Sequence, residues 1–203
     1  MDPTFVPSAF PPLALGFFGL GTGYLIYGPY ELLKWPPREN GVAESLGTWG
    51  IWLPGFCQFV CGTMLFAGLT FFRVFGLSPD GRPLTATPDY MAALAFSAYG
   101  IHWFAMGWNR AHGHDPRPNA GMSVAFMVIS ALGAVVFFHA SDWPVGLLFV
   151  LLFLIYLSDF FHAVGVAIAE NAHGLFHCVT GVWLMYLTFA VGVNFSLGFH
   201  WTV

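Results

Sequence analysis

Charged residues are scarce in this chain of 203 residues. Lys, Arg, Asp and Glu make up 8% of it, whereas soluble domains carry about 25%. The net charge is −4 and there is no basic run, so the charge pattern gives no indication of a nucleic-acid partner. Such a chain lacks the polar surface that water requires. With 57% hydrophobic residues and a mean hydropathy of +0.70, it is predicted to be an integral membrane protein surrounded by lipid, in the plasma membrane.

Cysteine is sparse as well, with three residues that all lie in apolar runs. Cys57 and Cys61 are four residues apart on one helix face, a spacing that fits neither a disulfide framework nor a zinc knuckle. We interpret them as small buried packing residues. The N-terminus lacks the positively charged region of a secretory signal, so the first apolar segment is expected to persist as a helix.

What the chain does contain is apolar segments of membrane length. A spanning helix needs about 20 apolar residues, and punctuation by Gly, Pro and charged residues marks six such segments. The fold class is therefore predicted to be all-α: one transmembrane domain over 1–203, a six-helix bundle. Pro54 should kink the second segment, and the many glycines should allow close helix packing in lipid. The predicted segments are 9–30, 47–72, 90–108, 120–139, 144–165 and 174–195.

The six basic residues all lie in loops or at helix ends. Four are at the side that receives the ends of segments one, three and five, and two are opposite. By the positive-inside rule, the first side is expected in the cytoplasm. The four are Lys34, Arg38, Arg110 and Arg117, and the two are Arg73 and Arg82.

Ionisable residues inside the spans are unevenly placed. Such groups are costly in lipid and are functional hypotheses by default. Tyr99 and His102 share a face of the third segment, and Ile155, Asp159 and His162 form a stripe on the fifth. The third and fifth segments run in the same direction, and the sixth starts where the fifth ends. One side of the membrane should therefore collect His102, Asp159, His162, His173 and His177, with His112 and His114 in the adjoining loop.

Three interpretations of this histidine-rich side stay open. The first is that the imidazoles near the interface are simply hydrated or bonded to carbonyls. The second is a proton-sensing vestibule, because histidine titrates near neutral pH, with His102, Asp159 and His162 as the sensing groups. The third is a transition-metal site, because one carboxylate and three imidazoles form a plausible ligand set. That set would be Asp159, His162, His173 and His177.

Several stretches resemble the acetate uptake transporter (succinate–acetate permease) family. The first of them resembles the signature that opens the family's first helix. In order along the chain, the stretches are Pro12–Gly19, Gly50–Gln58, Ala95–Trp103 and Gly181–Leu187. His102 stands where the family carries an aromatic residue. The resemblance implies a six-helix protomer with its own pore, assembled as a hexameric homo-oligomer. It also implies a hydrophobic pore constriction at Phe18, Tyr99 and Ile155.

The predicted function is transport of a small polar solute, most simply acetate or another short monocarboxylate, with possible proton linkage. Gln58 and Ser97 are expected to hydrogen-bond the solute, although a buried Gln such as Gln58 also serves as interhelical glue. No catalytic residue and no cofactor are expected, so the protein is not predicted to be an enzyme.

Two alternatives remain. Asn109, Gly113, Asp115, Arg117 and Pro118 are spaced as in the loop after the third helix of the acid-gated urea and amide channels, which are also six-helix hexamers. The other alternative is a subunit of a membrane redox complex that uses the histidines as ligands of a transition metal or a haem.

Overall fold

The computed structural model describes residues 11–72 and 88–203, and in these ranges it is helical, with no strand. The prediction of an all-α fold is therefore confirmed. Arg73 and Arg82, which entered the charge balance, lie outside the described residues. The elements are α1 (Pro11–Leu32), α2 (Val42–Gly50), η2 (Ile51–Gly55), α3 (Phe56–Ala67), η3 (Gly68–Phe72), α4 (Pro88–Ala111), α5 (Asn119–His139), α6 (Trp143–Ala163) and α7 (Ala167–Leu197).

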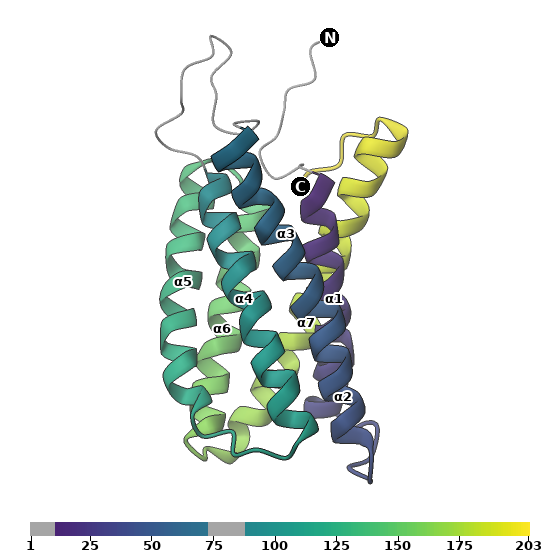
Figure 1. Ribbon diagram of the computed structural model, residues 1–203, viewed down its shortest axis with the longest axis vertical. Helices are drawn as coiled ribbons and strands as arrows, with labels where there is room; N and C mark the ends of the chain where they lie inside the picture. The colour runs from purple at the N-terminus through teal and green to yellow at the C-terminus, as the bar shows by residue number, and fades with distance from the viewer. Residues whose placement is uncertain (1–10, 73–87) are drawn as a thin grey trace.

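The helices form one up-and-down bundle (Figure 1). Four stretches are long and apolar enough to cross a membrane by length and composition: Val42–Phe71, Asn119–His139, Trp143–Ala163 and Ala167–Leu197. Helices α1 and α4 have 22 and 24 residues. At 1.5 Å per residue they are about 33 and 36 Å long, which also matches the roughly 30 Å hydrocarbon core of a bilayer. The bundle thus contains six segments of membrane length.

The second predicted segment is one helical stretch with a π-helical turn at its proline. Helix α2 passes through η2 into α3 without a break, and Pro54 lies inside η2. Proline cannot donate the backbone hydrogen bond of a regular helix and clashes with the preceding turn. A π turn accommodates such a residue. The stretch also begins at Val42, five residues before the predicted start at 47.

Helix α7 begins at Ala167, whereas hydropathy placed its start at 174. Its first turn contains Glu170, whose carboxylate is favourable at a helix N-terminus. The Glu170 carboxylate forms an ion pair with Lys34 Nζ at 3.0 Å and a second ion pair with Arg38. The extra turns are therefore stabilised by interactions that a hydropathy threshold does not register.

Glycine allows α1 and α7 to approach closely. A Cβ at Gly174 would lie 2.5 Å from the backbone nitrogen of Leu32, and one at Gly28 would lie 2.6 Å from Cys178 Sγ. The predicted role of small residues in close helix packing is thus confirmed here. The contact at Gly174 brings the C-terminal turn of α1, with Glu31, against the first turns of α7.

Candidate solute pathway

A vestibule opens at the end of the bundle where α1, α4 and α6 finish. Its volume is about 270 Å³, enough for several water molecules. Charged and amide side chains dominate its wall. The vestibule is lined by Glu31, Met106, Asn109, Arg110, Gly113, His114, Pro116, Asn119, Asp159, His162, Ala163 and His173.

Arg110 supplies an unpaired donor to the vestibule wall. One of its nitrogens lies 3.6 Å from Glu31 Oε1, and the guanidinium stacks over Tyr27, 4.7 Å from the ring centroid. Its Nη1 is buried and has no hydrogen-bond partner among the residues that the structure describes. A buried donor of this kind is costly to leave unmatched.

The loop at the vestibule rim carries a strong local ion pair. Arg117 donates to Asp115 from its backbone nitrogen and from Nε, at 2.9 and 2.8 Å. These bonds from Arg117 lower the pKa of Asp115 to about 2. Asp115 is therefore ionised throughout the range in which histidine titrates.

A much smaller middle cavity of about 10 Å³ lies deeper. It holds about one water molecule. His102 borders it, and neither ring nitrogen of His102 has a partner within residues 11–72 and 88–203. Asp159 borders both this cavity and the vestibule, and its Oδ2 accepts a 2.6 Å hydrogen bond from Ser123. The full lining is Tyr24, His102, Trp103, Met106, Ile155, Tyr156, Asp159, His173 and His177.

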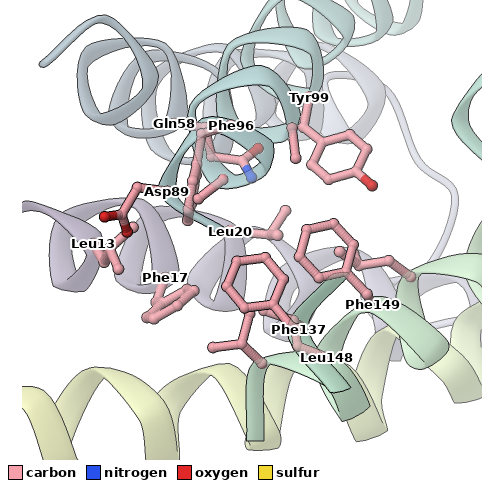
Figure 2. Close-up of a pocket in the computed structure, with 14 residues that line it drawn as sticks. Leu13, Phe17, Leu20, Gln58, Asp89, Phe96, Tyr99, Phe137, Leu148 and Phe149 are labelled. Carbon is pink, nitrogen blue, oxygen red and sulfur yellow. The ribbon is translucent and has the colours of Figure 1, made fainter. Parts of the chain in front are cut away.

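Beyond the middle cavity lies an apolar cavity of about 20 Å³ (Figure 2). Gln58 is fully buried in its wall, and neither Oε1 nor Nε2 has a partner in the described part of the chain. Tyr99 also borders it. The lining residues are Leu13, Phe17, Leu20, Gln58, Asp89, Ala92, Ala95, Phe96, Tyr99, Phe137, Val145, Leu148, Phe149 and Leu152.

The three cavities follow one another along the bundle. On α4, the vestibule is lined from Met106 onward, the middle cavity by 102–106, and the apolar cavity by 89–99. On α6 the order is the same, from 159–163 through 155–159 to 145–152. The spaces therefore form a line from one end of the bundle toward the other, and the two inner cavities are much smaller than the vestibule.

Two of the three predicted constriction residues line the inner cavities: Tyr99 borders the apolar cavity and Ile155 the middle cavity. The Tyr99 hydroxyl is 2.9 Å from Ser130 Oγ, and its ring stacks on Tyr156 at 5.6 Å. Ile155 is buried in the wall of the middle cavity. The sequence analysis did not single out Tyr156, although it adjoins Ile155 in the chain.

Phe18, the third predicted constriction residue, has an outward-facing side chain that is 42% exposed. Its neighbour Phe17 is 2% exposed and borders the apolar cavity. The centroid of its ring lies 5.6 Å from that of Phe96. The structure thus brings Phe17, rather than Phe18, to the pathway within one protomer. Ser97, the second predicted hydrogen-bonding residue, lies at the close contact of α4 with Gly62 and does not line the three cavities.

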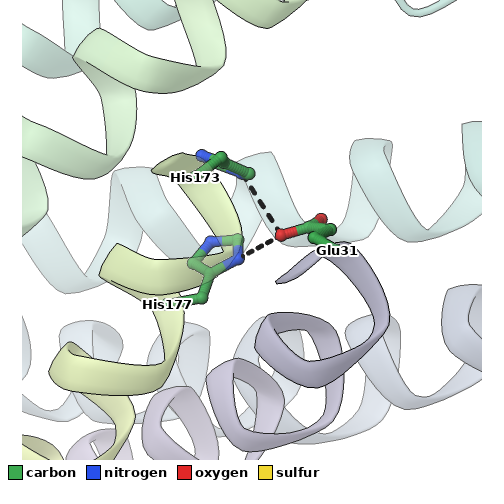
Figure 3. Close-up of side chains that lie close together, drawn as sticks. All are labelled: Glu31, His173 and His177. Carbon is green, nitrogen blue, oxygen red and sulfur yellow. Dashed lines mark hydrogen bonds and ion pairs between the residues drawn. The ribbon is translucent and has the colours of Figure 1, made fainter. Parts of the chain in front are cut away.

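The histidines of α7 pair with a carboxylate that the sequence analysis missed. His177 Nδ1 is 2.7 Å from Glu31 Oε2, and His173 Nε2 is 3.9 Å from the same oxygen (Figure 3). The predicted ligand set paired these histidines with Asp159 and His162. Both line the vestibule, but neither belongs to this close group. The available signal was an acidic residue inside an apolar helix, which is costly in lipid.

The chain was compared with known protein families, curated sequences and solved structures, and a solved structure shares its fold. No protein-family model and no curated protein sequence matches the chain. Among solved structures, the chain is similar to one described as the bacterial acetate channel SatP. The TM-score is 0.71, with 93% of this chain and 95% of that chain covered, at 13% sequence identity. The chain therefore has the fold of a helical membrane channel. Neither result supports the local resemblance to urea and amide channels.

Proposed function

We propose that this protein is a membrane channel or transporter for a short monocarboxylate such as acetate, with the solute passing inside the protomer. The observation that carries the proposal is the line of three cavities along the bundle, in a fold similar to that of an acetate channel. An anion would meet Arg110 in the vestibule, pass Tyr99 and Ile155, and exchange hydrogen bonds with Gln58 in the apolar cavity. A pathway needs few such groups besides a narrow waist.

Two features support a carboxylate rather than a cation. Arg110 lines the vestibule, where it faces the carboxylates of Glu31 and Asp159. The inner cavities, of about 10 and 20 Å³, would have to widen for a small solute to pass, and that solute would shed most of its water. A solute that loses its water is favoured when fixed donors, such as Arg110 Nη1 and Gln58 Nε2, replace its lost hydrogen bonds.

We further propose that transport is linked to pH through His102. A protonated imidazole in the middle cavity would offset the repulsion between a passing anion and Asp159. Transport of the anion should then rise as the pH falls and His102 becomes protonated. The ionisable groups that share this cavity with His102 are Asp159 and Tyr156 from α6, His173 and His177 from α7, and Tyr24 from α1.

The assembly and its place in the cell are part of the same proposal. By resemblance, we expect a hexamer in the plasma membrane, in which outward-facing side chains such as Phe18 contact lipid or neighbouring protomers. Native mass spectrometry from mild detergent measures the oligomer directly. An active monomer would reject the hexamer.

The decisive experiment is uptake of labelled acetate and labelled urea into proteoliposomes at several pH values. Acetate uptake above that of empty liposomes, saturable and faster than urea uptake, is the expected result. Urea uptake without acetate uptake would reject the proposal in favour of the urea or amide alternative. Solute protonation also rises as the pH falls, so each variant must be compared with the wild type at the same pH.

A further inference from the structure

Glu31, His173 and His177 form a compact group of possible metal ligands where α1 ends against α7 (Figure 3). One ligand atom from each residue lies within 4.8 Å of the other two. All three side chains are buried, with exposures of 4%, 6% and 1%. The two histidines are four residues apart on one helix, and the close approach at Gly174 holds Glu31 beside them.

One ligand of the group already has an outer hydrogen bond of the kind that orients metal ligands, and a second faces a charged side chain. His173 Nδ1 lies 3.1 Å from the carbonyl oxygen of Ile155, which leaves Nε2 with its lone pair on the side of Glu31. The second carboxylate oxygen of Glu31 faces Arg110 at 3.6 Å. Metal-bound histidines typically donate their other ring N–H to a carbonyl or carboxylate, and metal-bound carboxylates are hydrogen-bonded in turn.

We propose that Glu31, His173 and His177 bind one divalent transition-metal ion of the zinc class. Two imidazole nitrogens and one carboxylate oxygen suit zinc, copper, nickel or cobalt. Calcium and magnesium prefer several oxygen ligands, and this group offers the oxygens of a single carboxylate. Because Glu31 and His173 also line the vestibule, an ion can arrive from there and complete its coordination with water.

Binding would replace one hydrogen bond of the metal-free cluster. His177 Nδ1 donates its proton to Glu31 Oε2 across 2.7 Å. To ligate through that nitrogen, the neutral ring must carry its proton on Nε2 instead, and the carboxylate oxygen then bonds the metal rather than the proton. This tautomer change leaves the net charge of the protein unchanged, and the Nε2–H that it creates takes an acceptor of its own, as in other metal-bound histidines.

A bound ion would also affect passage along the pathway. His173 borders both the vestibule and the middle cavity, so an ion on it stands between the two spaces. A metal from the vestibule side should therefore inhibit solute flow. This consequence rests on the proposed transport function, whereas metal binding itself does not.

The test uses the full chain purified without a histidine tag and stripped with a chelator. After addition of Co²⁺ or Zn²⁺ and removal of the excess, elemental analysis should find about one ion per chain. X-ray absorption of the zinc form should show two imidazole ligands. Glu31→Gln and His177→Gln should each weaken binding about tenfold or more, whereas His162→Asn, in the vestibule but outside the cluster, should bind like the wild type.

Three results would overturn the metal site. The first is that the wild type retains no ion. The second is that Glu31→Gln and His177→Gln retain the ion as well as the wild type does. The third is that His162→Asn loses the ion while Glu31→Gln retains it. The wild-type measurement decides even if a variant fails to fold, which gel filtration would reveal. In proteoliposomes, Zn²⁺ should inhibit uptake by the wild type and not by Glu31→Gln. Uptake that persists with the ion bound would reject the inhibitory role and leave the binding site intact.

Discussion

Replacing Gln58 by methionine separates a solute-binding role from a structural one. The side chain is fully buried in the wall of the apolar cavity, and both amide atoms lack partners among the described residues. A buried amide without hydrogen bonds costs about 1–3 kcal/mol. Methionine has nearly the same shape and no such penalty. In a chain of this size, 1 kcal/mol shifts Tm by roughly 2–4 °C, so Gln58→Met should raise Tm by several degrees.

The same substitution should weaken transport. A hydrogen bond from a neutral donor to a charged carboxylate contributes about 1.5–3 kcal/mol, which corresponds to roughly tenfold to a hundredfold in affinity. Acetate uptake by Gln58→Met should therefore saturate at a concentration higher by about that factor. Tm is measured from tryptophan fluorescence in detergent, and saturation from uptake into proteoliposomes at one fixed pH.

Thr180→Val is the matched control. Thr180 is also fully buried, and its hydroxyl has no partner in the described part of the chain, but it does not line the three cavities. Its replacement should raise Tm without changing uptake. A Gln58→Met variant that loses stability and transports normally would refute the reasoning and identify Gln58 as interhelical glue.

The remaining predictions concern the waist and the pH response. Tyr99→Ala and Phe17→Ala should raise solute permeability and lower selectivity, because both remove rings that line a cavity of about 20 Å³. Phe18→Ala should do the same only if a neighbouring protomer turns that ring toward the pathway. If all of these variants fold and transport like the wild type, the pore lies elsewhere. His102→Phe should flatten the pH dependence of uptake relative to the wild type, and an unchanged profile would exclude His102 as the sensor. Asp115→Asn should leave the profile between pH 5 and 8 unchanged. The folded-state pKa of Asp115 is lowered to about 2, so the stability that its ion pair contributes is lost only as the pH falls through about 4 to 2.

The sequence by itself determined the membrane setting and the helical architecture. Each span satisfies its backbone hydrogen bonds internally and needs only local apolar length, so hydropathy together with Gly, Pro and charge punctuation predicted six segments. Alternating helix direction then followed from short connections. That alternation is why His102, Asp159 and His173 could be assigned to the same end of the bundle before any contact was known.

Only the tertiary structure decided which side chains meet. In lipid, both the buried and the outward faces of a helix are apolar, so composition does not reveal how the helix is rotated about its axis. Packing against neighbouring helices sets that rotation. The resemblance pointed to Phe18, whereas the packed bundle turns Phe17 inward within one protomer, and spacing alone paired Asp159 with the α7 histidines. The glycine contact between α1 and α7 instead brings Glu31 to His177, across 146 residues of chain.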